Sequence, residues 1–251
     1  MTTPFGRRIG AVLSRRVVGR YVVLGIGDPG VVVEPGQFYM LAAVAGWGGG
    51  AGERPYLPRA ISVLHARDGE VGFLLEDVGP GTQRLCELGL GEEVYLVGPL
   101  GKGFTPPLAG REAILVGGGV GIPPLAMFQE RWGGQALLGF RTAQHAQAAS
   151  VFADPEIATD DGFAGHHGHV TDLLDDFLEH GEDVAVFACG PPAMLKAVQS
   201  RAARHRIPAQ LALEAPMACG YGACFGCVVE TVDGYKRVCV DGPVFDAAVL
   251  V

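Results

Sequence analysis

The chain has 251 residues, which is long enough to bury a sizeable core and to form two or three domains. Its formal net charge is −8 and its 19 lysines and arginines form no basic block, so nucleic acid is not expected as its main partner. No apolar run is long enough to cross a bilayer, so the sequence predicts no membrane partner. Residues 1–8 lack the apolar core of a secretory signal, which predicts a cytoplasmic protein.

The first part of the chain, residues 1–106, is predicted to be a β domain. Short apolar runs alternate there with Gly and Pro turns, which is typical of an antiparallel barrel. The Gly-rich stretch 47–53 is expected to be a flexible loop within it. The predicted strands include residues 16–24, 37–41, 60–64 and 93–97.

The pattern changes near residue 110, where apolar strands begin to alternate with helices. Strands are predicted at 113–117, 135–140 and 183–189, with a helical stretch ending at Phe128 and a helix at 191–204. Strands that alternate with helices favour a parallel α/β sheet. We therefore assign residues 107–208 to a second, α/β domain.

A glycine-rich loop follows the first strand of this α/β domain. It contains Gly117, Gly118, Gly119 and Gly121, and two prolines then open a helix. Backbone N–H groups at a helix N-terminus bind phosphate well, so the loop is a candidate for a dinucleotide pyrophosphate. Pro124 stands where the full G-x-G-x-x-G pattern has its last glycine, so a turn that merely packs a helix on a strand stays open.

Four cysteines lie in the C-terminal segment, residues 209–251. Cys219, Cys224 and Cys227 form C-x4-C-x2-C, and Cys239 follows after eleven residues. This order of four thiols is typical of a plant-type [2Fe–2S] cluster, whereas a zinc ribbon usually has two close pairs. Zinc, disulfides and inert core thiols stay as alternatives. An Asp-Gly turn at 233–234 predicts a hairpin that brings Cys239 back toward the other three.

Four motifs follow one another along the chain in a recognisable order. Arg59-Ala60-Ile61-Ser62 and Gly79-Pro80-Gly81-Thr82 lie in the β domain, and residues 117–124 and 189–194 lie in the α/β domain. They resemble the flavin, flavin-phosphate, dinucleotide and nicotinamide motifs of the ferredoxin–NAD(P)⁺ reductase superfamily. Within it the chain resembles the electron-transfer subunits of NAD-dependent dihydroorotate dehydrogenase, class 1B. The closer match is carried by residues 159–162, 168–174, 217–227 and 238–245.

The resemblance implies a flavin-binding barrel, a nucleotide-binding α/β domain and a small [2Fe–2S] module, with FAD, the cluster and NAD(H) as cofactors. It places FAD at Arg59, Ala60, Ile61, Ser62, Gly81 and Thr82. It places the dinucleotide at the four loop glycines and at Cys189, Gly190 and Pro191, with Cys189 as a packing and electrostatic group. Gly101 and Lys102 are weaker candidates near the flavin, and Arg141 could meet a 2′-phosphate or be solvated. No residue is assigned as catalytic.

The function implied by the resemblance is electron transfer between NAD⁺ and a partner in pyrimidine (UMP) biosynthesis. The implied partner is an FMN-containing dihydroorotate dehydrogenase catalytic subunit, in a heterotetramer of two of each. Two alternative functions stay open. One is a reductase subunit of a hydrogenase, transhydrogenase-like or oxygenase complex, and the other is a redox sensor without turnover. A metal site at three clustered histidines also stays open, although a solvated loop is favoured there. These histidines are His166, His167 and His169.

Overall fold

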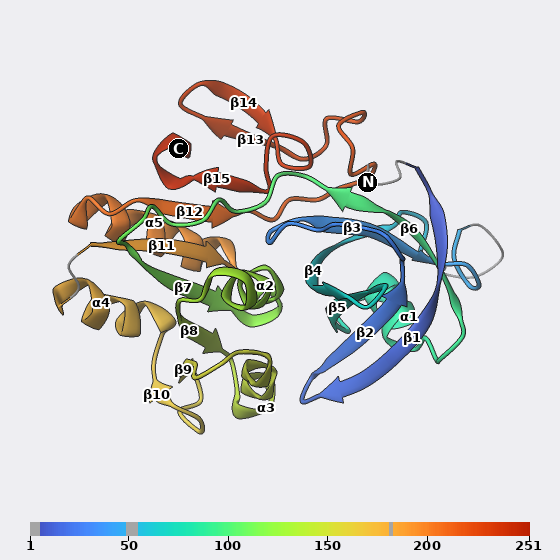
Figure 1. The fold of residues 1–251 in the computed structure, drawn as a ribbon, viewed down its shortest axis with the longest axis horizontal. Coiled ribbons are helices and arrows are strands. Elements are labelled where there is room, and N and C mark those ends of the chain that lie inside the picture. Colours follow the sequence, from blue (N-terminus) through green and yellow to red (C-terminus); the bar gives the residue numbers. More distant parts are fainter. Residues whose placement is uncertain (1–5, 49–54, 181–182) are drawn as a thin grey trace.

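The computed structural model describes residues 6–48, 55–180 and 183–251. Most of the expected 47–53 loop therefore lies outside the described residues. A barrel and an α/β domain lie side by side, and the C-terminal segment runs along one edge of both (Figure 1). No helix of the described chain is both long and apolar enough to span a bilayer.

The barrel is closed and antiparallel, as predicted. Its strand order is β1-β2-β5-β4-β3-β6, and β6 pairs back onto β1 with Arg8 opposite Leu96. Inward-pointing apolar side chains fill it, among them Leu24, Tyr39 and Phe73. The strands are β1 (Arg8–Val18), β2 (Tyr21–Gly27), β3 (Phe38–Ala43), β4 (Arg59–Arg67), β5 (Glu70–Glu76) and β6 (Glu93–Leu100).

The single strand predicted at 16–24 is wrong, because the chain reverses there between β1 and β2. Gly19 adopts a φ of +58°, which L side chains rarely adopt, and a side chain there would also collide with Gln144 of the α/β domain. A second difference is helix α1 (Pro80–Cys86), which begins inside the motif expected to be a simple turn. The prolyl ring at its first position suits a helix start.

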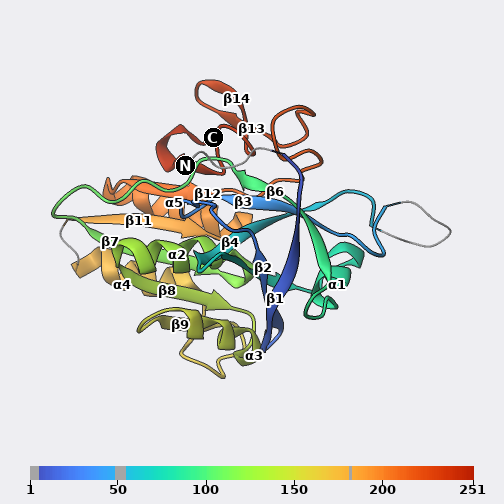
Figure 2. The ribbon, with the colours of Figure 1, turned by 45° about the vertical axis from the view of Figure 1, so that its right-hand side comes forward.

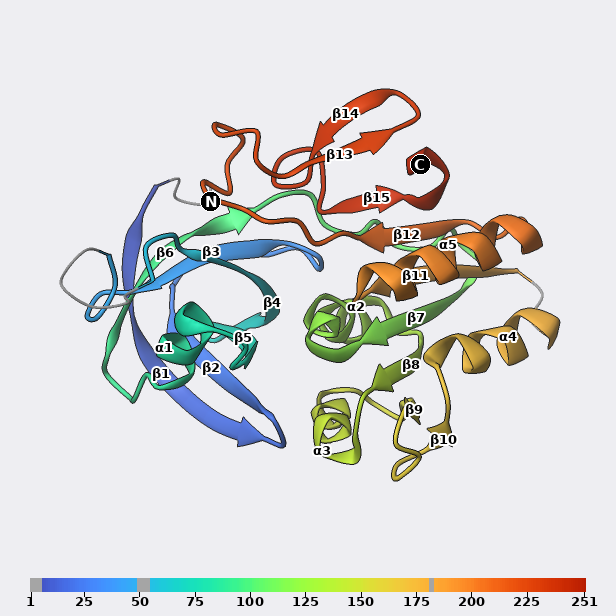
Figure 3. The ribbon, with the colours of Figure 1, turned by 180° about the vertical axis from the view of Figure 1, so that it is seen from behind.

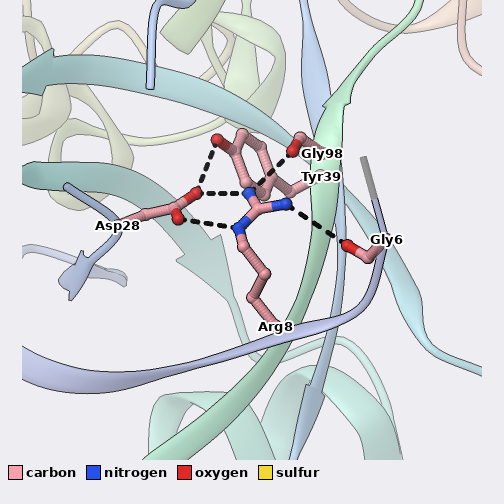
Figure 4. Close-up of polar contacts among 5 residues, drawn as sticks. All are labelled: Gly6, Arg8, Asp28, Tyr39 and Gly98. Atoms are coloured by element: carbon pink, nitrogen blue, oxygen red, sulfur yellow. Dashed lines mark hydrogen bonds and ion pairs between the residues drawn. The ribbon is translucent and has the colours of Figure 1, made fainter. Parts of the chain in front are cut away.

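A partly buried polar cluster joins the first strand to the rest of the barrel (Figure 4). The Arg8 guanidinium donates to both carboxylate oxygens of Asp28, at 2.9 and 2.6 Å, and to the carbonyl of Gly98 at 2.7 Å. The Tyr39 hydroxyl donates to the same carboxylate at 2.9 Å. Burial first, and then the Asp28 charge, raise the pKa of Tyr39, so its hydroxyl stays a donor.

The α/β domain has a seven-stranded sheet in the order β10-β9-β8-β7-β11-β12-β15. All neighbours are parallel except β15, which pairs antiparallel with β12 at the edge. The strands are β7 (Glu112–Gly118), β8 (Gln135–Phe140), β9 (Glu156–Thr159), β10 (His166–His167), β11 (Val184–Cys189), β12 (Ala209–Ala212) and β15 (Val244–Asp246). The helices are α2 (Pro123–Trp132), α3 (Ala143–Ala146), α4 (Val170–His180) and α5 (Pro192–His205). Short 3-10 turns lie at Gly119–Gly121 (η1), Gln147–Val151 (η2) and Ala247–Val249 (η3).

Helices cover both faces of this sheet (Figure 3). Leu115 points toward α2, whereas its neighbours Ile114 and Val116 pack with α4 and α5 on the other face. The face that carries α2 also meets the barrel, because Tyr21 and Leu74 belong to the same core cluster as Leu115. The alternation of side chains along β7 therefore builds both the domain core and the interface with the barrel.

Two strands of the C-terminal segment, β12 and β15, form one edge of this sheet, and the rest of the segment folds over the barrel (Figure 2). The predicted hairpin is confirmed, with β13 (Val228–Thr231) paired antiparallel to β14 (Gly234–Arg237). Cys227 and Cys239 pack in one apolar cluster with Phe38, Met40 and Leu100 of the barrel. The segment is thus fixed to the outside of strands β3 and β6.

Candidate functional site

Two loops meet at the carboxyl end of the parallel sheet. The register of β7 and β11 places Gly117 beside Cys189, so the loops that follow these strands start side by side. A methyl group built on Gly121 would lie 2.7 Å from Gly190 Cα, which only a glycine pair allows. Gly118 approaches the second loop equally closely, because a carbon added to it would lie 2.8 Å from Pro191 Cδ. The two sequence motifs therefore form one surface.

The order of the strands explains why a ligand site forms there. From β7 the chain runs outward to β8, β9 and β10 on one side, and then returns to β11 and β12 on the other. Loops diverge at such a switch point and leave a crevice beyond the carboxyl ends of the strands. The glycine loop forms the 3-10 turn η1, with Gly119 at φ +53°, and contacts strand β5 of the barrel.

A cleft of about 670 Å³ opens at this point between the two domains. Gly118, Gly119 and Gly121 line it together with Pro191 and Met194, whereas Gly117 lies buried just behind the loop. Its size is that of a pocket for a nucleotide-sized ligand. The barrel contributes Tyr21 and Glu76, and the polar side chains Arg141, His145, Asp160, His169 and Glu214 complete the wall.

Cys189 is buried at the end of β11, and Glu214, which lines the cleft, acts on it electrostatically. Burial, and then the nearby Glu214 charge, raise the pKa of Cys189, so its thiol stays protonated and is no nucleophile. Loss of water in the cleft likewise raises the pKa of Glu214, although the residue as a whole is exposed. Glu214 was not predicted as a site residue. One signal was present in the sequence, because Glu214 follows strand β12 at the carboxyl edge of the sheet, where the other cleft residues lie.

The predicted flavin residues lie on β4 and at the start of α1. Arg59 and Gly81 are brought together, because a carbon added to Gly81 would lie 2.5 Å from Arg59 Nη2. The Thr82 hydroxyl donates to the Gly79 carbonyl and accepts the Val78 N–H, both at 3.1 Å, and so closes the turn. This pairing of a guanidinium with a close-packed glycine turn suits a phosphate.

The other three flavin candidates lie on the same strand, β4. Ala60 pairs with Met40 and Ser62 pairs with Phe38 of β3, with Ile61 between them. Ala60 is exposed, whereas Ile61 and Ser62 are half-buried. The assignment of these side chains to FAD stays a prediction.

The weaker candidates occupy other places. The Lys102 N–H donates to the Gly242 carbonyl at 2.6 Å, and Gly101 packs on Pro243, so both join the barrel to the C-terminal segment. Two of the three clustered histidines face carboxylates: His166 Nε2 lies 3.3 Å from Asp172, and His169 Nδ1 lies 3.7 Å from Asp160. The predicted loop is wrong at one point, because His166 and His167 form the edge strand β10.

Cys219, Cys224 and Cys227 lie on a tightly wound loop, and Cys239 follows the β13–β14 hairpin. Gly220, Gly222 and Phe225 adopt φ values of +80°, +88° and +57°. A side chain on Gly220 would lie 2.7 Å from Met40 Sδ, so the loop sits directly on the barrel. Burial raises the pKa of Cys219, but the N–H groups of neighbouring residues outweigh it and lower this pKa to about 6. These N–H groups are those of Tyr221, Ala223 and Cys224.

The thiols are grouped in two pairs. Cys219 lies within hydrogen-bonding reach of the Cys224 thiol, and the Cys239 N–H donates to Cys227 Sγ at 3.4 Å. Burial, and then the Cys227 thiol, raise the pKa of Cys239 to about 12. Across the described ranges, no three Cys, His, Asp or Glu side chains converge on one metal ion. In a [2Fe–2S] group each iron takes two thiolates, so four thiols in two pairs fit such a group.

Comparisons with known proteins agree with this geometry. Residues 214–251 match the family model for the iron–sulfur cluster binding domain of dihydroorotate dehydrogenase B. A solved structure described as the NADH-dependent reduced ferredoxin-NADP oxidoreductase, a flavin-based electron-bifurcating protein, superimposes with a TM-score of 0.82. It is 25% identical, and the match covers 98% of this chain and 91% of that one. A ferredoxin reductase of carbazole 1,9a-dioxygenase, 21% identical, shares the fold over 81% of this chain and 66% of its own, with a TM-score of 0.66.

Curated relatives match over most of their length. A protein of Clostridium acetobutylicum is 35% identical over 85% of this chain and 84% of its own. One of Bacillus caldolyticus is 36% identical over 87% of both chains, and one of Bacillus cereus strain B4264 is 38% identical over 84% and 85%. All three are named dihydroorotate dehydrogenase B (NAD(+)), electron transfer subunit. This chain belongs to that family of electron-transfer subunits.

Proposed function

We propose that the chain carries electrons between NAD(H) and a dihydroorotate dehydrogenase catalytic subunit in pyrimidine biosynthesis. One observation carries this proposal: the flavin motif and the cysteine loop lie one strand apart. Ala60 of the motif pairs with Met40, and Met40 in turn packs against Gly220 of the loop. The dinucleotide loop touches the same barrel through β5. Three sites therefore lie in series, which suits an oxidoreductase that relays electrons.

FAD and a [2Fe–2S] cluster, when bound, supply hydride exchange with nicotinamide and single-electron transfer, respectively. The chain's own residues hold and orient these groups. Arg59 and the turn at Gly81 and Thr82 would hold the flavin phosphates, and Ser62, on the same strand, would donate to the flavin ring. The loop at 117–121 would take the dinucleotide pyrophosphate, and the neutral Cys189 would pack beside the nicotinamide.

The cysteine loop has an exposed apolar surface on which a partner protein could dock. Cys224 is exposed on this loop, and its sequence neighbours Tyr221 and Phe225 are large side chains with exposures of 52% and 61%. A patch of this kind on a module that must pass electrons onward marks an interaction site. We assign it to the FMN-containing catalytic subunit, in an assembly of two copies of each chain.

We place this assembly in the cytoplasm. None of the six cysteines forms a disulfide, and a reducing compartment keeps cysteines unpaired and available to hold a cluster.

Co-purification tests the proposal. The native complex should contain FAD, FMN, iron and sulfide, and it should reduce NAD⁺ when dihydroorotate is added. The isolated chain, loaded with FAD and cluster, should oxidise NADH with an artificial acceptor but should not oxidise dihydroorotate. A chain that holds zinc in place of iron, or that purifies with a different redox partner and no dihydroorotate activity, would overturn the proposal.

A further inference from the structure

An ion pair crosses the domain boundary inside the dinucleotide cleft. Glu76, the last residue of barrel strand β5, accepts a hydrogen bond from Arg141 Nη2 at 2.8 Å. His145 Nε2 lies 3.4 Å from the same carboxylate oxygen. The Glu76 side chain is 14% exposed, whereas that of Arg141 is 68% exposed. The carboxylate is therefore fixed in the wall, and the arginine is the partner that can move.

This arginine is the main positive charge of the cleft. Of the described side chains that line it, Arg141 is the one Arg or Lys, and three carboxyl groups stand against it. Asp160 comes from the α/β domain, Glu214 from the start of the C-terminal segment and Glu76 from the barrel. His169 Nδ1 lies 3.7 Å from Asp160. With Arg141 held by Glu76, the cleft has no unpaired permanent cation among these lining residues.

The position of the pair points to the adenosine half of a dinucleotide. Arg141 directly follows β8, the neighbour of the strand that carries the glycine loop, and Asp160 directly follows β9. Residues at these strand ends meet the ribose in open α/β sheets, where an acidic side chain suits a 2′-hydroxyl and an arginine suits a 2′-phosphate. A 2′-phosphate brings up to two negative charges, and here it would need the guanidinium that Glu76 already binds.

We propose that Glu76 of the barrel sets the nucleotide preference of this chain by withholding Arg141 from a 2′-phosphate, so that NADH is used in preference to NADPH. The preference is then decided across the domain boundary, by a residue outside the nucleotide-binding domain. This inference rests on the proposed position of the dinucleotide in the cleft.

The test is a double-mutant cycle on the FAD-loaded full chain. Steady-state reduction of ferricyanide is measured with NADH and with NADPH for the native protein, Glu76→Gln, Arg141→Ala and the double variant. Glu76→Gln removes the charge but keeps an amide oxygen, so Arg141 becomes free to bind phosphate. We expect kcat/KM for NADPH to rise about tenfold or more relative to NADH. The rise should vanish in the double variant, because its cause is the guanidinium.

A matched control is available at a second ion pair between barrel and α/β domain. Glu34 accepts a hydrogen bond from Arg131 of α2, outside the cleft. Glu34→Gln should leave the NADPH/NADH ratio unchanged. A ratio unchanged in Glu76→Gln while NADH is still oxidised, or a gain that persists without Arg141, would overturn the inference. If the native protein oxidises neither nucleotide, the proposed function fails, and this inference fails with it.

Discussion

Replacing Gly81 with Ala probes the proposed flavin-phosphate turn with one methyl group. The added carbon would lie 2.5 Å from Arg59 Nη2, so the guanidinium must retreat by about 1 Å to restore van der Waals contact. Gly81 is buried, so the methyl group has no other place to go. A hydrogen bond from a guanidinium to a charged group is worth about 1.5–3 kcal/mol, so FAD affinity should fall about 10- to 100-fold.

Gly79 supplies the matched control from the same turn. A carbon added there meets nothing within 4 Å, and its φ of 168° is extended backbone that any residue adopts. Titrating deflavinated protein with FAD, followed by flavin fluorescence, gives the dissociation constants of both alanine variants. Gly79→Ala should bind FAD within about threefold of the native protein, since its change costs less than about 0.7 kcal/mol. Equal affinities for Gly81→Ala and the native protein would refute the placement of Arg59 over the phosphates.

Two further predictions concern stability. Asp28→Ala should lower the free energy of unfolding by about 1.5–3 kcal/mol, because it removes the buried carboxylate that the half-buried Arg8 guanidinium and the Tyr39 hydroxyl both contact. Urea denaturation measures this, and a loss below about 0.5 kcal/mol would show that Arg8 and Tyr39 find other partners. Asp172 has a pKa below its ordinary 3.8 because it accepts the His169 N–H. Its stabilising effect is therefore complete above about pH 4 and is lost as the pH falls through the lowered value, so Asp172→Asn should flatten the acid limb of the stability curve. An unchanged acid limb would refute that role.

Local pattern predicted most of the strands and helices. The run 135–140 and the hairpin at 233–234 coincide with observed elements, because a continuous apolar strand and an Asp-Gly turn are determined by neighbouring residues. The β1–β2 reversal was missed because apolar residues lie on both sides of Gly19 and Arg20, so the whole stretch resembles one strand. Helix α1 was missed because seven residues that begin Pro-Gly form a helix only through packing on the barrel.

The residues that complete the cleft show where sequence reasoning stops. Gly117 and Cys189 were singled out by motif, and their adjacency follows from the β7–β11 register. Tyr21 and Glu76 reach the same cleft from the barrel, and no local pattern marks them. Their position depends on how two domains pack, which is a tertiary property that neither periodicity nor spacing encodes. Arg141 was identified, but its neutralising partner was not.

The order of electron flow is tested most directly by adding NADH to the anaerobic, fully loaded protein and recording absorption and electron paramagnetic resonance together. We expect the flavin absorption to bleach and a paramagnetic signal of a reduced [2Fe–2S] group then to appear. In Cys227→Ser the bleaching should persist without that signal, because the flavin turn and the cysteine loop are separate parts of the fold. A native protein whose flavin bleaches without the signal, or that contains zinc by elemental analysis, would rule out this order of electron flow.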